Sequence, residues 1–134
     1  MNRVVVCGAP CAGKSTYARE VLLPRAPAGT MMWQLDTLIA SHAWSDQSEV
    51  AVRYLESPNP CIVEGCAAVR ALRKWLQRHP TGRPCERVVR MTVPRTPHTP
   101  GQAKLAKGEA TIWAEIEADL VSRGVDVSHI DATV

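Results

Sequence analysis

A run of nine residues near the start of the chain has the spacing of a phosphate-binding loop. Gly8, Gly13, Lys14 and Ser15 match the pattern G-x-x-x-x-G-K-[ST]. Glycines let backbone N–H groups approach an anion, and the helix that follows adds positive charge. In this pattern the lysine reaches the outer phosphates and the serine hydroxyl is a ligand of Mg²⁺. The alternative is a chance glycine-rich turn. The sequence therefore predicts a nucleoside triphosphate site made by Gly8, Ala9, Pro10, Cys11, Ala12, Gly13, Lys14, Ser15 and Thr16.

Two acidic residues follow predicted strands and would meet this loop at one edge of a parallel sheet. Asp36 follows the strand predicted at 31–35, and Glu64 follows the strand predicted at 61–63. Asp36 is the candidate general base, because a carboxylate there could accept the proton of an attacking hydroxyl; the alternative is a cap for a helix that starts at Thr37. Glu64 is the candidate metal ligand, directly or through water, against the alternative of a solvated strand-end acid. The two residues could also exchange these roles.

Phosphoryl transfer also needs positive charge near the migrating group, which a mobile lid often supplies. Arg95, Lys104 and Lys107 follow the fourth predicted strand, in a segment of about 94–110 that could form a short lid. Arg95 joins Lys14 as a candidate catalytic cation. Each of the three lid residues could instead be an ordinary exposed cation. The four histidines have no metal-ligand or triad spacing and are assigned no role.

The hydrophobic pattern predicts the elements that would position these residues. Strands are expected at 3–7, 31–35, 61–63, 88–93 and 125–130, and helices at 16–23, 37–43, 45–56, 69–77 and from about 102 to 120. Strands that alternate with helices indicate an α/β fold. We expect residues 1–134 to form a single domain with a three-layer P-loop NTPase fold, in which a parallel sheet of about five strands has helices on both faces.

Composition sets further limits. Apolar residues make up 46% and charged residues 22% of the chain, which is ordinary for a globular protein. The five cysteines fit no zinc template, and no secretory signal or long apolar run is present, so a reduced cytoplasmic location and no membrane partner are expected. Cys7, Cys61 and Cys66 are expected in the core. The oligomeric state cannot be read from the sequence.

The net charge of +3 is unevenly distributed. The segment from Arg70 to Arg95 is strongly basic, and the segment 108–134 is acidic. Such blocks usually are solvated helix faces. A basic block within reach of a phosphate site could also hold a polyanionic partner such as a nucleic acid.

Three features of the sequence resemble small P-loop kinases of the zeta-toxin and adenylate-kinase-like kind. They are the loop with its flanking strand and helix, Leu35-Asp36 at the end of a second predicted strand, and Val63-Glu64-Gly65 at the end of a third. The resemblance is closest to the kinase domain of phage-type polynucleotide kinases. It implies ATP with Mg²⁺, an aspartate after the second strand as general base, and arginines in a lid after the fourth strand. Lys14, Ser15 and Asp36 match. In the lid, Lys104 and Lys107 stand where paired arginines would be expected, so either lysines substitute or the lid differs.

These observations favour an ATP-dependent phosphotransferase that acts on a hydroxyl of a nucleoside, a nucleotide or a nucleic-acid 5′ end. A second hypothesis is a nucleotide-binding ATPase or switch without a small acceptor. A GTPase is disfavoured because no Asn-Lys-x-Asp segment occurs. A third hypothesis is a nucleic-acid-binding module that uses the loop only to hold a phosphate backbone.

Overall fold

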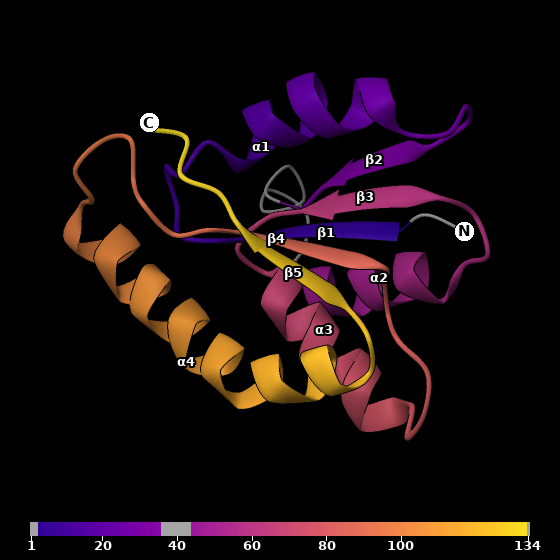
Figure 1. The fold of residues 1–134 in the computed structure, drawn as a ribbon. Helices are drawn as coiled ribbons and strands as arrows, with labels where there is room; N and C mark the ends of the chain where they lie inside the picture. The colour runs from indigo at the N-terminus through magenta and orange to yellow at the C-terminus, as the bar shows by residue number, and fades with distance from the viewer. Residues whose placement is uncertain (1–2, 36–43, 134) are drawn as a thin grey trace.

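The structure, a computed structural model, describes residues 3–35 and 44–133. Its core is a parallel sheet of five strands in the order β2-β3-β1-β4-β5 (Figure 1). The strands are β1 (Arg3–Gly8), β2 (Met31–Gln34), β3 (Cys61–Glu64), β4 (Arg87–Met91) and β5 (Asp126–His129). The helices are α1 (Lys14–Tyr17), continued by a π-helical turn η1 (Ala18–Leu22) and a 3₁₀ turn η2 (Leu23–Arg25), then α2 (Trp44–Glu56), α3 (Ala68–Arg78) and α4 (Pro100–Ser122).

Helices cover both faces of the sheet, which gives the three predicted layers. The α1–η1 segment lies on one face, and α2, α3 and α4 lie on the other (Figure 1). Alternate residues of β1 pack against the two helical layers, because successive side chains of a strand point to opposite faces of the sheet. Val6 packs with Tyr17 and Leu22 beneath the first helix, whereas Val5 and Cys7 pack against the three-helix layer. The predicted three-layer α/β architecture with about five parallel strands is confirmed.

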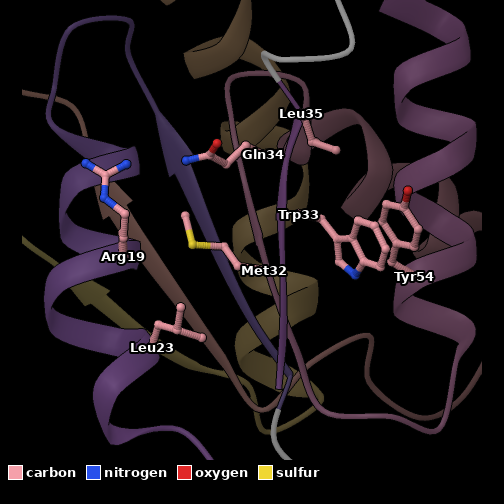
Figure 2. A pocket seen from close by; sticks show the side chains of 7 residues that line it. All are labelled: Arg19, Leu23, Met32, Trp33, Gln34, Leu35 and Tyr54. Carbon is pink, nitrogen blue, oxygen red and sulfur yellow. The ribbon is translucent and has the colours of Figure 1, made fainter. Parts of the chain in front are cut away.

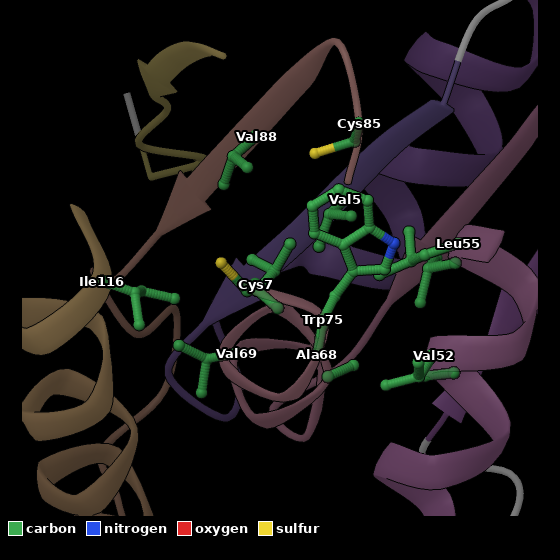
Figure 3. Close-up of a cluster of buried hydrophobic side chains, with 14 of the residues drawn as sticks. Val5, Cys7, Val52, Leu55, Ala68, Val69, Trp75, Cys85, Val88 and Ile116 are labelled. Carbon is green, nitrogen blue, oxygen red and sulfur yellow. The ribbon is translucent and has the colours of Figure 1, made fainter. Parts of the chain in front are cut away.

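The larger core lies between the sheet and the layer formed by α2, α3 and α4. Trp75 of α3 sits near its centre, with Val52 and Leu55 from α2, Val88 from β4 and Ile116 from α4 around it (Figure 3). These side chains are buried. Apolar burial of this kind is the main favourable term in folding. Buried cysteines also contribute, and the expectation that Cys7, Cys61 and Cys66 are core residues is confirmed.

Several element boundaries differ from the sequence-based prediction. Helix α4 begins at Pro100, not near Gln102, and β4 ends at Met91, not at residue 93. The earlier helix start is explained by a capping box, in which the Thr99 hydroxyl accepts from the Gln102 N–H at 3.2 Å and the Gln102 side chain accepts from the Thr99 N–H at 3.0 Å. Proline is favourable at the first position of a helix, because that N–H has no helical partner. The segment 94–110, in which a lid was predicted, therefore consists of a short loop followed by the first part of helix α4.

The helix predicted at 37–43 lies outside the described residues. Within the described ranges, no helix combines the length and apolar character needed to cross a membrane.

A buried ion pair joins α4 to the sheet. Arg90 of β4 contacts the carboxylate of Glu109, and the two residues are only 3% and 4% exposed. The Arg90 guanidinium also lies over the Trp113 ring at 4.5 Å from its centroid and 3.5 Å from the Cys7 sulfur. Burial raises the pKa of the Cys7 thiol to about 12 despite the nearby Arg90, so this thiol stays protonated. These contacts anchor the middle of α4 against β1 and β4.

Replacing Glu109 by Gln would leave the Arg90 charge buried without its counter-charge. We expect Glu109→Gln to lower the free energy of unfolding by about 3–5 kcal/mol, measured by urea denaturation. The matched control is Glu115→Gln on the same helix, which breaks an exposed pair with Arg73 and should cost less than about 1 kcal/mol. Equal losses in the two variants would contradict the importance given to the buried pair.

Candidate phosphate-binding site

The glycine-rich loop connects β1 to α1 at the carboxyl edge of the sheet. Gly8 has φ 143°, and a Cβ there would lie 2.0 Å from the Met91 carbonyl oxygen, so only glycine fits between β1 and β4. Gly13 has φ 85° and immediately precedes α1. Between them Cys11 has φ 61°, a left-handed conformation that is unusual for a residue with a side chain. Residues 10–16 of the predicted loop line one cavity of about 300 Å³.

Lys14 is almost completely buried, with 5% of its surface exposed. Its Nζ donates a hydrogen bond to the Ala9 carbonyl at 2.5 Å, across the loop. A buried ammonium needs strong acceptors, and a phosphate would supply better ones than a carbonyl. Lys14 thus lies at the position that the sequence pattern predicts, with its side chain reaching back across the loop.

Ser15 and Glu64 meet beside the loop. The Ser15 hydroxyl donates to Oε1 of Glu64 at 2.7 Å, and Glu64 is completely buried. The register of β1 and β3 explains this meeting, because Glu64, the last residue of β3, pairs with Val6, two residues before β1 ends at Gly8. A hydroxyl and a carboxylate are oxygen ligands of the type that Mg²⁺ prefers, and Mg²⁺ in kinases keeps few protein ligands beside waters and phosphates. The residues therefore fit the predicted metal. No larger group of His, Cys, Asp and Glu capable of holding a metal occurs in the described ranges.

Arg95 lies against the loop. Its backbone N–H donates to the Cys11 carbonyl at 2.7 Å, and its side chain lies 3.1 Å from the place where a Cβ on Gly13 would be. The structure thus brings this predicted cation to the loop. Lys104 and Lys107 are exposed on α4, and neither lines the loop cavity. Asp36 lies outside the described residues, so its predicted role stays a prediction.

Sequence reasoning missed two polar residues that hold the loop. His98 Nε2 lies 2.8 Å from the Pro10 carbonyl, which can only accept, so this nitrogen carries the proton in that contact. Gln102 donates to the Cys11 sulfur at 3.4 Å and lines the loop cavity. His98 lies in the β4–α4 connection and Gln102 in the first turn of α4, about 90 positions further along the chain, and no local pattern links them to the loop.

A second cavity, of about 480 Å³, lies beside the edge strand β2. Met32 and Gln34 face Arg19 of η1, whereas Trp33 and Leu35 lie toward α2 (Figure 2). Trp33 stacks on Tyr54 with ring centroids 4.0 Å apart. This cavity includes Leu35, the residue before Asp36, but none of the phosphate-loop residues. It is separate from the loop cavity.

Part of the basic segment 70–95 is paired with acids within the fold. Three of its cations form ion pairs with acids of other helices: Arg73 with Glu115, and Lys74 and Arg78 with Glu49. Hydrogen bonds from Arg78 and Lys74 lower the pKa of Glu49 to about 2, so the pairs persist at neutral pH. The fold thus gives these charges partners on neighbouring helices, which weakens the reason for expecting a polyanion surface on α3.

Comparisons with known proteins place the fold. No family model and no curated protein matches the sequence. Among solved structures, the chain is similar to the shikimate kinase of Aquifex aeolicus, with 17% sequence identity and a TM-score of 0.54, over 96% of this chain and 85% of that one. The likeness, together with the loop geometry, shows a three-layer α/β P-loop fold. The closer resemblance to phage-type polynucleotide kinases stays a prediction.

The accessible thiol in the loop allows a direct test of occupancy. Cys11 is exposed, whereas the other four cysteines are buried. We expect N-ethylmaleimide to modify Cys11 alone in the folded protein, as located by mass spectrometry. ATP with Mg²⁺ at about ten times its dissociation constant should slow this reaction about tenfold, because about one loop in ten remains free. A Cys11→Ser variant provides the unlabelled control. Equal rates with and without nucleotide would mean that the triphosphate binds elsewhere.

Proposed function

We propose that this chain is an ATP-dependent phosphotransferase, which moves the γ-phosphate of ATP to a hydroxyl group of an acceptor. The observation that carries the proposal is the contact of Ser15 with the fully buried Glu64, directly beside the phosphate loop. A loop that only held a phosphate backbone would have no need of a buried carboxylate, which repels an anion. A buried carboxylate paired with the loop hydroxyl suits a metal-bound triphosphate.

The residues in and around the loop have different parts in the proposed reaction. The backbone N–H groups of the loop and the Lys14 ammonium bind the phosphates, after Lys14 exchanges the Ala9 carbonyl for a phosphate oxygen. Ser15 and Glu64 would hold Mg²⁺, which when bound neutralises charge on the phosphates. Arg95, which lies against Gly13, supplies further positive charge to the nucleotide. Asp36 is the proposed general base.

The acceptor oxygen forms a bond to the γ-phosphorus, and the bond from that phosphorus to the β–γ bridging oxygen breaks, so that ADP leaves. The hydroxyl proton passes to the proposed base, Asp36. The acceptor classes suggested by the sequence are nucleosides, nucleotides and nucleic-acid 5′ ends. The name of the structural neighbour adds shikimate to the compounds worth testing.

The test is transfer of labelled γ-phosphate from ATP to a panel of nucleosides, nucleotides, a 5′-hydroxyl oligonucleotide and shikimate. We expect at least one acceptor to be labelled, and Asp36→Asn to lower the rate by about 10²–10⁴-fold while ATP affinity is retained. ATP hydrolysis that no acceptor alters and that Asp36→Asn leaves unchanged would contradict the proposal. It would favour an ATPase or switch instead.

The metal role of Glu64 has its own test. Glu64→Gln keeps an oxygen that can accept from Ser15 but removes the negative charge. We expect the affinity for ATP in the presence of Mg²⁺ to fall by about tenfold or more, measured by isothermal titration calorimetry. The affinity measured with EDTA in place of Mg²⁺ is the control and should match that of the unmodified protein. A loss of the same size in EDTA would indicate structural damage to the loop, not a metal role.

A further inference from the structure

A third cavity, of about 460 Å³, lies between the start of α3 and the first half of α4. Its apolar surface comes from Val69 of α3 and from Leu105 and Ile112 of α4. This volume is within the range of small-molecule sites, which combine apolar walls with a few polar groups. The cavity shares no lining residue with the phosphate-loop cavity.

Two glycines of α4 leave this space open. Gly101 and Gly108 both line the cavity, and they lie seven positions apart, about two helical turns, on the same face. A Cβ at either position would meet nothing within 4 Å, and neither glycine has a positive φ. Packing and backbone conformation therefore do not require glycine. Because glycine in the middle of a helix is less stable than alanine, Gly108 is unfavourable for the helix and its effect is to widen the cavity.

Two cations border the cavity without competing acids. Arg70 and Lys104 are exposed lining residues, and neither forms an ion pair within the described part of the chain. The one acid in the lining, Glu109, is already paired with Arg90. The N-terminal end of α3, where Val69 and Arg70 lie, adds partial positive charge. The cavity thus combines apolar walls with a positive mouth.

The cavity also adjoins the proposed transfer site. Cys66 in its wall is two residues after Glu64, which contacts Ser15. Gly101 is next to Gln102, which lines the phosphate-loop cavity. The wall that begins at Cys66 and the wall that begins at Gly101 therefore both start beside the phosphate loop. A molecule in the cavity would have one end near that loop.

We propose that this cavity binds the phosphate acceptor, and that the acceptor is a small molecule with an apolar body, a hydroxyl group and one anionic group, a carboxylate or a phosphate monoester. Arg70 and Lys104 bind the anionic group, and the hydroxyl points toward the phosphate loop. The proposal rests on the phosphotransferase function proposed above. It selects small anionic acceptors over neutral nucleosides.

Binding is tested first, without turnover, on protein saturated with ADP and Mg²⁺. The probes are two pairs that differ in charge: 4-hydroxybenzoate with 4-hydroxybenzamide, and CMP with cytidine. We expect at least one anion to shift the NMR amide signals of Cys66, Val69 and Leu105 with a dissociation constant below about 10 mM, and its neutral counterpart to bind at least about tenfold more weakly. The carboxylate and phosphate pairs show which anion is preferred. No shift with either anion, or equal binding by the neutral counterparts, would overturn the proposal.

Variants then locate the site. Gly108→Phe places a ring in the open space and should abolish probe binding, whereas Ala110→Phe, at an exposed position on the opposite face of α4, should not change it. Arg70→Ala should weaken the anion by about fivefold and leave its neutral counterpart unchanged. Arg53→Ala removes the same charge from the exposed surface of α2 and is the control. An unchanged affinity in Gly108→Phe or in Arg70→Ala would place the anion elsewhere.

The two proposals fail in different ways. If the phosphotransferase function is wrong, ADP-saturated protein still binds the anion, but no anionic acceptor is labelled by ATP. If the cavity is not the acceptor site, labelling of an acceptor continues in Gly108→Phe at an unchanged KM. ADP affinity in Gly108→Phe should stay within about twofold of the unmodified protein, which shows that the loop is intact. Gly108→Ala should raise the melting temperature, which checks that glycine is not required for folding.

Discussion

The contact between Ser15 and Glu64 depends on the parallel register of β1 and β3. Val6 pairs with Glu64, so the carboxylate is held at the level where β1 gives way to the glycine-rich loop. A shift of that register by one residue would turn the Glu64 side chain to the other face of the sheet. Gly8 adds a second constraint, because β4 approaches it too closely for any side chain. Backbone pairing within the sheet, and not the loop alone, therefore places the Ser15 hydroxyl and the Glu64 carboxylate together.

Charge is distributed by the fold in a way that the sequence does not reveal. In the sequence, a basic block precedes an acidic one. In the structure, Arg73 and Arg78 are paired with acids of neighbouring helices, and Arg90 is paired with Glu109 inside the protein. The pairs on the helical layer link α3 to α2 and to α4 at the surface. Cations that lack such pairs among the described residues include Arg70 and Arg95, and both lie beside cavities at the carboxyl edge of the sheet.

The parts of the fold that the sequence predicted are those with strong local signals. The strands β1 to β4 each contain a short apolar or β-branched run, and the loop has a fixed pattern, so these strands and the loop between β1 and α1 were predicted closely. The start of α4 was misplaced, because Pro100 reads as a loop residue although it is the first residue of the helix. The contacts of His98 and Gln102 with the loop could not be predicted, since they join distant segments through single hydrogen bonds. Burial of Glu109 was equally hidden in an acidic segment.

The anchoring of α4 bears on how the predicted lid segment would bring positive charge to a bound nucleotide. From Pro100 onward the segment is part of one helix of 23 residues, which is capped at Thr99 and joined to the sheet by the Arg90–Glu109 pair. The loop before it is tied to the phosphate loop through Arg95 and Cys11. These contacts place Arg95 beside the phosphate loop, whereas Lys104 lies on α4 beside the cavity between α3 and α4. Closure of this segment over an acceptor stays a prediction, and it would have to start from a helix that is already capped and paired with the sheet.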